Sequence, residues 1–479
     1  MSRALLLLAA AVLAAGCNSG EEASERPNVV VIMTDDQRVD EMAVMPAVRR
    51  LIVRPGAWFA RSFASFPLCC PSRATFLTGQ YAHNHGVLDN RPPRGGYYKL
   101  DSSETLPVWL QRAGYETAHI GKYLNGYGTL RPREVPPGWD EWNAVIDPTT
   151  YYYRGYVLNE NGRIVRPRRY QTDEMTARAL RFLRRAEPPF FLSLAYLAPH
   201  DDRRGGRCAD SAKPAPRHAG RFARVPMPRP PSFGERDMSD KPSFLRSLPF
   251  GPFEIGYVER QWRCRRESLL AVDEGVERIV AALRRGGELD DTLIVFTSDN
   301  GYFLGEHRLP DEKINVYEEG VRVPLAIRAP GVPAGPRVPD PVANVDLAPT
   351  ILDAAGTEAG LKMDGRSLLP LARRPGRHMN RPILLENLAR PYERRFTPYT
   401  AVRFGAFLYA EYVNGERELY DLRRDPSQLR SIHRRRGYAD FRFDLARLLR
   451  RLRACHGRMC RTRFRSSAEL LSRDRIPRQ

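Results

Sequence analysis

Apolar runs and amphipathic stretches alternate along most of this chain. The run from Asn28 to Met33 is almost continuously apolar and rich in β-branched residues, as is typical of a strand buried on both faces. Residues 190–197 and 292–297 carry similar runs, whereas residues 172–186 and 256–285 repeat apolar side chains near helical spacing. Because strands alternate with helices, we predict an α/β fold whose large, mostly parallel sheet is sandwiched between helices. The alternation also includes a predicted helix over 104–113 and a predicted strand over 115–120.

The pattern changes after about residue 375. Short strands and a turn at Asn414-Gly415 replace the long apolar runs, and an amphipathic helix follows over 439–454. We therefore predict a main domain over residues 28–375 and a small antiparallel α+β subdomain over 376–479. Residues 201–250 are rich in Pro, Gly and Arg, and they are expected to form either a long insertion over the active face or a partly mobile loop. The expected C-terminal strands are 382–387, 399–404, 406–412 and 417–421.

Polar side chains follow several of the predicted strands of the main domain. Open α/β sheets bind their ligands beyond the carboxyl ends of the strands, so these side chains are expected to meet at one edge. Asp and Asn also favour turns, and this accounts for some of the positions but not for all of them. The residues concerned are Asp35, Asp36, Lys122, His200, Asp299 and Asn300.

The segment from Cys69 to Gly79 reads Cys-Cys-Pro-Ser-Arg-Ala-Thr-Phe-Leu-Thr-Gly and is the most informative in the chain. Pro71 suits the first turn of a helix and Gly79 suits its end, so Cys69 is expected at the N-terminus of that helix. Free backbone N–H groups and the helix dipole favour an anion at this place. Arg73 lies about one turn on and can reach the same point. For Cys69 alone, a buried structural cysteine is the alternative.

This motif, Cys-x-Pro-Ser-Arg followed by x-x-x-Leu-Thr-Gly, resembles the signature of the type I, formylglycine-dependent sulfatases. The resemblance covers most of residues 27–430 and implies an alkaline-phosphatase-like fold with a sulfatase catalytic domain. It also implies that a maturation enzyme oxidises Cys69 to formylglycine, whose hydrate supplies the nucleophile. The doubled cysteine, the Lys-Tyr-Leu-Asn run from Lys122 and the segment 81–86 are most similar to N-acetylglucosamine-6-sulfatases.

The resemblance also implies a metal site. Asp35 and Asp36 match one metal-binding segment of the family, and Asp299 with Asn300 matches the second. Together with the formylglycine at Cys69, they are expected to hold one divalent cation. Carboxylate and amide oxygens suit Ca²⁺, which is usual in the family, or Mg²⁺, and they do not suit zinc.

Two lysines resemble the sulfate-binding lysines of the family. They are Lys122 and Lys313, two of only six lysines among the 76 basic residues of the chain. His200, in the run Ala-Pro-His, resembles a histidine that binds sulfate or transfers a proton. Either Lys313 or His200 is expected to protonate the leaving oxygen. The expected catalytic residues are Cys69, Arg73, Lys122, His200 and Lys313.

One position departs from the pattern of the family. Many arylsulfatases carry a histidine two residues beyond the first active-site lysine, where this chain has Leu124. The histidine base is therefore expected at His200, with His85 and His307 as alternatives.

These residues predict a sulfuric ester hydrolase that removes sulfate from a carbohydrate ester. A phosphonate monoester or phosphodiester hydrolase of the same fold is the first alternative, because sulfate and phosphate esters are nearly isosteric. The second alternative is an inactive surface lipoprotein that binds glycans and in which Cys69 stays a thiol. The formal net charge of +20 comes with a strong excess of arginine over lysine, which is typical of GC-rich coding, so composition alone is the first interpretation of this charge. A polyanionic substrate such as a sulfated polysaccharide is the second. No nucleic-acid-binding motif is visible, so no nucleic acid partner is expected.

The first residues resemble an export signal, predicted as a signal peptide over 1–17. Arg3 precedes an apolar stretch over residues 4–15 that is too short to span a membrane. The following Leu-Ala-Ala-Gly-Cys resembles a bacterial lipobox, so Cys17 is expected to carry a lipid anchor; plain cleavage and secretion is the alternative. Residues 18–27 are expected to form a tether.

The remaining cysteines suggest disulfides, which export permits. Cys455 and Cys460 are expected to form a small local bridge. Cys208 and Cys264 either pair or stay free, because spacing alone does not decide connectivity. Cys70 is expected to be a buried neighbour of the site or a spare thiol.

Overall fold

The computed structural model describes residues 26–202, 204–374, 376, 378–389 and 396–461. The predicted signal peptide, Cys17 and most of the predicted tether lie outside these residues. Within the described ranges, no helix combines the length and the apolar character needed to cross a membrane.

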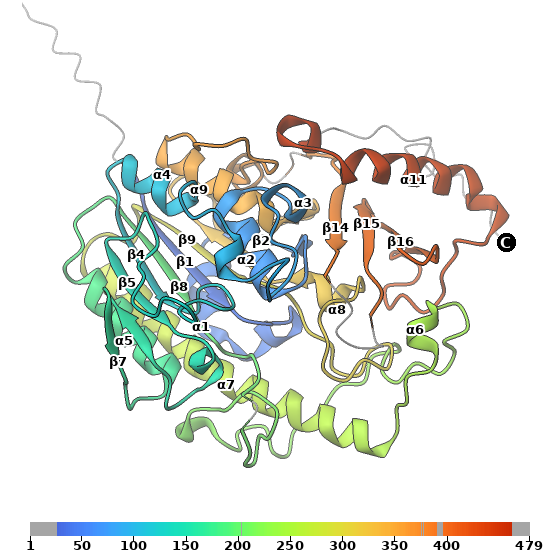
Figure 1. Cartoon of the computed structure of the whole chain (residues 1–479), viewed down its shortest axis with the longest axis horizontal. Coiled ribbons are helices and arrows are strands. Elements are labelled where there is room, and N and C mark those ends of the chain that lie inside the picture. The colour runs from blue at the N-terminus through green and yellow to red at the C-terminus, as the bar shows by residue number, and fades with distance from the viewer. Residues whose placement is uncertain (1–25, 203, 375, 377, 390–395, 462–479) are drawn as a thin grey trace, which may run out of the picture.

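A ten-stranded sheet forms the centre of the larger part of the molecule (Figure 1). β1 (Asn28–Thr34) lies between β8 (Phe190–Ala195) and β9 (Thr292–Ser298) and is parallel to both. β4 (Glu116–Gly121) and β5 (Glu141–Val145) extend the parallel part beyond β8. The sheet is therefore mixed and mostly parallel at its centre, as predicted. The outer strands are β2 (Ala57–Phe59), β6 (Leu158–Glu160), β7 (Arg163–Val165), β11 (Leu325–Arg328) and β12 (Arg337–Val338).

Helices cover both faces of this sheet. Successive residues of β1 belong to two separate apolar clusters: Val29 and Val31 to one, and Val30 and Ile32 to the other. The strand is thus buried on both faces, which is why its sequence is an unbroken apolar run. The first face is covered by α2 (Cys69–Thr78), α4 (Leu106–Arg112) and α9 (Leu347–Ala355), and the second by α5 (Gln171–Leu183) and α7 (Pro252–Arg285).

The helix α7 begins four residues earlier than the sequence pattern predicts. Pro252 occupies its first turn, and the side chain of Glu254 accepts a hydrogen bond of 2.8 Å from the backbone N–H of Gly251. These capping contacts extend the helix beyond the apolar stripe on which the prediction rested.

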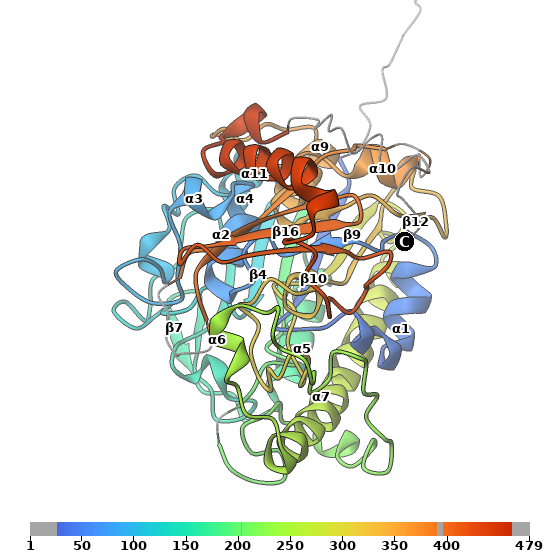
Figure 2. The ribbon, with the colours of Figure 1, turned by 90° about the vertical axis from the view of Figure 1, so that its right-hand side faces the viewer.

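A separate four-stranded antiparallel sheet forms the C-terminal part, as predicted. Its hairpin turns at Asn414-Gly415, where Gly415 has a left-handed φ of 86°. The helix α11 (Ala439–Arg453) lies across this sheet (Figure 2). The division into two domains at residue 375 stays a prediction. The strands are β14 (Ile383–Asn387), β15 (Tyr399–Phe404), β16 (Phe407–Tyr412) and β17 (Arg417–Asp421).

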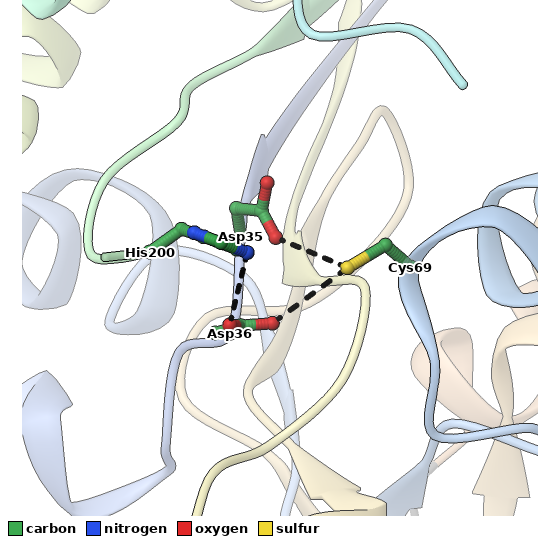
Figure 3. A group of neighbouring side chains, drawn as sticks. All are labelled: Asp35, Asp36, Cys69 and His200. Carbon is green, nitrogen blue, oxygen red and sulfur yellow. Dashed lines mark hydrogen bonds and ion pairs between the residues drawn. The ribbon is translucent and has the colours of Figure 1, made fainter. Parts of the chain in front are cut away.

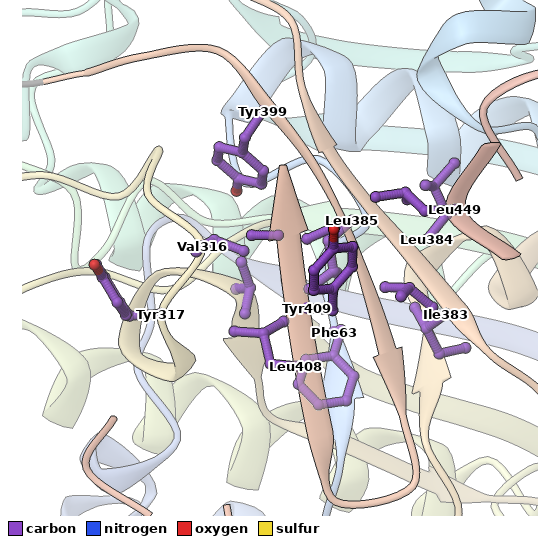
Figure 4. Packing of buried hydrophobic residues seen from close by; sticks show 14 of the residues in the cluster. Phe63, Val316, Tyr317, Ile383, Leu384, Leu385, Tyr399, Leu408, Tyr409 and Leu449 are labelled. Carbon is purple, nitrogen blue, oxygen red and sulfur yellow. The ribbon is translucent and has the colours of Figure 1, made fainter. Parts of the chain in front are cut away.

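The C-terminal sheet shares an apolar core with segments of the main domain. Leu408 and Leu449 belong to the same buried cluster as Phe63 and Val316 (Figure 4). A polar contact reinforces this junction: the hydroxyl of Tyr317 donates a hydrogen bond of 2.8 Å to the buried carboxylate of Glu418 on β17. The C-terminal sheet therefore supports the segment that carries Lys313. The hydroxyls of Tyr412 and Tyr420 donate to the same carboxylate.

The insertion over 201–250 has little regular structure, as predicted. It contains the short helix α6 (Ser243–Arg246), and a disulfide between Cys208 and Cys264 ties it to α7. This disulfide decides between the two alternatives left open for Cys208 and Cys264, and the expected disulfide Cys455–Cys460 is also present. Ser243 contacts Glu416 beside the C-terminal hairpin, so the insertion spans from the main sheet to the C-terminal sheet.

Candidate active site

Four neighbouring parallel strands carry the predicted site residues to one edge. In the order β4, β8, β1 and β9, three of the strands end directly before one of these residues or pairs, and β8 ends at Ala195, a short turn before His200. The register places Thr34 opposite Ser298 and Met33 opposite Ala195, so the carboxyl ends lie level. This shared edge brings Lys122, His200, Asp35, Asp36, Asp299 and Asn300 together from segments far apart in the chain.

Cys69 faces Asp35 and Asp36 from the N-terminus of α2 (Figure 3). Its Sγ atom is 3.7 Å from Asp35 Oδ1, 3.9 Å from Asp36 Oδ1 and 3.3 Å from Lys313 Nζ. The helix ends as predicted at Gly79, which has a left-handed φ of 66°. Cys69 is therefore buried between carboxylates and an ammonium group, and this is unlike the apolar surroundings of an ordinary structural cysteine.

The acidic side chains of the site lie close together. Asp35, Asp36, Cys69 and His200 each place one possible ligand atom within 4.8 Å of the others, and Asp299 joins this group through hydrogen bonds. Asp299 Oδ1 accepts hydrogen bonds from the backbone N–H of Asp36 (3.0 Å) and of Asn300 (2.8 Å). Asn300 Nδ2 donates to Asp36 Oδ1 over 2.7 Å. This leaves Asn300 Oδ1 buried with no hydrogen-bond partner among the described residues. An orphaned amide oxygen beside the carboxylates of Asp36 and Asp299 fits a hard divalent cation.

Basic side chains surround the same carboxylates. Lys313 Nζ lies 2.7 Å from both oxygens of Asp36, and Lys122 pairs with Asp35. Arg73 Nε donates to Asp299 Oδ2 over 2.9 Å. Four cationic groups are thus packed against the three carboxylates. His200 is the fourth cation, with Nε2 3.6 Å from Asp36 Oδ2.

The charges shift the pKa values of these buried groups. Burial alone would raise the pKa of Asp35, but the nearby charges of Lys122, His200 and Arg73 hold it well below its usual value. Burial would lower the pKa of Lys313, but Asp36 raises it well above its usual value. The pKa of His200 is raised in the same way, by Asp201, Asp36 and Asp35 against the effect of burial. The neighbouring carboxylates therefore favour the protonated forms of Lys313 and His200.

The structure separates the three candidate histidines. His85 lies against Thr75 Oγ1 and the backbone of Val87, and burial lowers its pKa to about 3. His307 pairs with Glu235 at 2.7 Å and stacks on a tyrosine ring. Of the three, His200 is the one that contacts the acidic pair.

Two contacts at the site were not predicted from the sequence. The ring of Tyr151 lies 4.9 Å from Lys122 Nζ and 4.8 Å from the ring of His200, and its hydroxyl accepts a hydrogen bond from Asn125 Nδ2. Tyr151 ends a short 3₁₀ turn that has no periodicity to mark it. The Lys-Tyr-Leu-Asn run begins at Lys122 and ends at Asn125, so this run was the sequence signal that could have pointed to a contact here.

The second unpredicted contact is a buried ion pair between Arg265 and Glu41, at 2.9 Å. The guanidinium of Arg265 also donates to the carbonyl oxygens of Asp36 and Pro199. It therefore fixes the backbone beside two site residues. Arginine is so frequent in this chain that nothing in the sequence distinguishes Arg265.

Comparison with known proteins identifies the family. The family model described as "Sulfatase" matches residues 27–357. The chain belongs to the sulfatase family. A second model, "N-sulphoglucosamine sulphohydrolase, C-terminal", matches residues 305–455 of this sulfatase. It is accordingly a sulfuric ester hydrolase, and its family generally uses a formylglycine and a divalent metal.

Several relatives of this sulfatase are known. It is 34% identical to an arylsulfatase of Volvox carteri, over 95% of this chain and 78% of that protein. It is 36% identical to human N-acetylglucosamine-6-sulfatase, over 73% of this chain and 65% of the human protein. It is 30% identical to the N-acetylglucosamine-6-O-sulfatase of Bacteroides thetaiotaomicron, over 94% of this chain and 90% of that protein. The chain spans only 49% and 32% of the extracellular sulfatase homologues of Caenorhabditis elegans and Drosophila melanogaster.

Solved structures share the fold. One is described as a complex with its substrate D-glucosamine-2-N,6-O-disulfate; it has a TM-score of 0.78 and 28% identity, over 89% of this chain and 97% of that one. The phosphonate monoester hydrolase of Agrobacterium radiobacter has a TM-score of 0.70 and 22% identity, over 90% of this chain and 96% of that one. At this identity, the second likeness shows the fold alone.

Proposed function

We propose that this sulfatase removes sulfate from a carbohydrate sulfate ester of the N-acetylglucosamine 6-sulfate type. Formylglycine made from Cys69 is the proposed nucleophile. The proposed divalent cation, Ca²⁺ or Mg²⁺, is held by that residue and by Asp35, Asp36, Asp299 and Asn300. The proposed catalytic side chains are Arg73, Lys122, His200 and Lys313.

The observation that carries the proposal is the surroundings of Cys69. Its Sγ lies within 4 Å of two carboxylates and 3.3 Å from the ammonium group of Lys313. Such an arrangement binds and activates an anionic group at position 69, because positive charge is fixed where negative charge would develop. The buried, partnerless Asn300 Oδ1 supports the cation.

Each protein side chain has a definite part in the proposed reaction. Arg73 and Lys122, both buried, hold the charges of Asp35 and Asp299 in place, and Lys122 and His200 offer positive charge to sulfate oxygens. Lys313 is the proposed proton donor to the leaving oxygen, because its Nζ is the basic nitrogen that contacts Cys69 Sγ. A formylglycine at position 69 would supply a nucleophilic hydroxyl, and the cation would supply further positive charge beside it.

A carbohydrate substrate is supported by the names of the relatives. Two of them are N-acetylglucosamine-6-sulfatases, and one neighbouring structure is described with a glucosamine disulfate as its substrate. We also propose export of the protein, either anchored through a lipid on Cys17 or secreted. The two disulfides are consistent with an oxidising compartment. A formylglycine-generating enzyme is the maturation partner that this function requires.

The deciding experiment compares the two adjacent cysteines. The Cys69→Ala variant should lose at least about a thousandfold in turnover of an aryl sulfate, as when a nucleophile is removed. Cys70→Ala is the matched control and should keep its activity, because burial raises the pKa of the Cys70 thiol to about 12 and removes it from nucleophilic chemistry. Equal losses in both variants would contradict the choice of residue.

Mass spectrometry of the tryptic peptide 62–73 tests the modification directly. The aldehyde makes the peptide lighter than the unmodified thiol form. A thiol in an active preparation would contradict the formylglycine, whereas a thiol in an inactive one would favour a glycan-binding lipoprotein. Faster turnover of a phosphonate monoester than of a sulfate ester would favour the phosphonate hydrolase.

A further inference from the structure

A second pocket lies away from Cys69, between the insertion and the C-terminal sheet. Its volume is about 370 Å³, and it is lined by residues of α6, of the β16–β17 hairpin and of the segment around His433. This volume falls within the range of small-molecule sites. Cations outnumber anions in its lining, with Lys241, Arg246, Arg417 and Arg434 against Asp240 and Glu416.

The acidic residues of this pocket already have partners. The carboxylate of Glu416 accepts hydrogen bonds from the backbone N–H and the hydroxyl of Ser243, both at 2.9 Å, and from Asn414 Nδ2 at 2.7 Å. Asp240 pairs with Lys241 at 3.0 Å and also accepts a hydrogen bond from the backbone of Ser431. These carboxylates therefore hold the pocket walls together.

The arginines Arg417 and Arg434 differ in this respect. Both are exposed, and neither side chain forms an ion pair or hydrogen bond with another residue in the described part of the chain. Arg246, in contrast, lies 3.3 Å from the carboxylate of Glu416, which also accepts the hydrogen bonds from Ser243. The pKa of His433 between them is lowered, first by burial and then by Arg434 and a further arginine of α11. The positive charge of the pocket is thus not neutralised locally.

We propose that this pocket is a second anion site that binds a sulfated saccharide unit. Unpaired guanidinium groups present planar forks that match the oxygens of a sulfate group. The inference rests on the proposed function only for the kind of saccharide, because the binding itself requires no turnover.

The test measures binding in the full-length Cys69→Ala protein, which is not expected to turn the ligand over. A heparin-derived tetrasaccharide is titrated by calorimetry into this protein and into the same protein with Arg417→Ala and Arg434→Ala. We expect the Cys69→Ala protein to bind two saccharides per chain, and the protein that also carries Arg417→Ala and Arg434→Ala to bind one. The matched control removes the same charge through Arg181→Ala and Arg184→Ala, two exposed arginines of α5 and its C-terminal cap, and should bind two.

Three outcomes would overturn the proposal. The first is unchanged stoichiometry in the pocket variant, and the second is an equal loss in the α5 control. The third is equally tight binding of an unsulfated chitotetraose, or of inorganic sulfate alone, at the pocket. Failure of the proposed function is a separate result. Arg417→Ala and Arg434→Ala placed in the protein with Cys69 intact should leave turnover of a small aryl sulfate unchanged, whereas a wrong active-site assignment would appear as turnover retained by the Cys69→Ala protein.

Discussion

Asn300 shows how a single polar atom can point to a function. Its amide nitrogen is committed to Asp36 and to the carbonyl of Gly301, which orients the oxygen inward. Glycine is required at position 301, because a Cβ there would meet the carbonyl oxygen of Glu319 at 2.0 Å. A buried carbonyl oxygen held in this way costs stability unless it binds a cation or a donor.

At the residue scale, we predict that Asn300→Ala weakens cation binding. Ca²⁺ should raise the melting temperature of the chelated wild-type protein, since a ligand that binds only the folded state stabilises it. The variant should need at least about tenfold more Ca²⁺ for the same shift. Thermal unfolding at increasing Ca²⁺ measures this independently of activity. An identical Ca²⁺ dependence in both proteins would contradict the site, and full activity after chelation would do so as well.

At the scale of elements, the short helix α3 (Ala82–His85) joins the main domain to the C-terminal sheet. His83 Nδ1 lies 3.0 Å from Glu386 on β14, and Nε2 lies 2.9 Å from the carbonyl oxygen of Cys455. Burial alone would lower the pKa of His83, but the hydrogen bond and charge of Glu386 raise it to about 9. The protonated histidine therefore stabilises the junction.

This raised pKa predicts how stability depends on pH. The folded-state pKa exceeds the unfolded value of about 6.5, so the contribution is complete below that pH and is lost as the pH rises through about 9. His83→Gln should lower the free energy of unfolding by roughly 2–3 kcal/mol at pH 6. The difference should shrink toward pH 10. Urea unfolding between these pH values measures it.

The exposed His456 offers a control for this measurement. His456→Gln should change the free energy of unfolding little at any pH, because an exposed side chain gives up few contacts. A difference between wild type and His83→Gln that stays constant with pH would contradict the proposed ion pair.

At the scale of the whole molecule, two disulfides close loops of very different length. Cys208 and Cys264 are 56 residues apart and tie the insertion to α7, whereas Cys455 and Cys460 are five residues apart. The chain-entropy account predicts that removal of the first costs about 4 kcal/mol and removal of the second about 2 kcal/mol. Pairs of Cys→Ser substitutions with urea unfolding test this. Equal losses would contradict the loop-length argument.

The main strands and the helix after Cys69 were predictable because their signals are local. The apolar run of β1 reflects burial on both faces, and Pro71 and Gly79 mark the start and end of α2 through backbone conformation alone. The prediction that polar residues meet beyond β1 and β9 also held, because parallel strands bring their carboxyl ends to one edge. The roles of those residues remain proposals.

The sequence by itself determined the strand–helix alternation, the C-terminal sheet and the residues gathered at the sheet edge. Only the tertiary structure decided that His200, and not His85 or His307, faces the acidic pair, and that Tyr151 and Arg265 support the site. It also decided the pairing of Cys208 with Cys264 and the pocket beside Arg417. The physical reason is distance along the chain: propensity and periodicity act over a few residues, whereas these contacts join segments that meet only when the sheets and helices pack together.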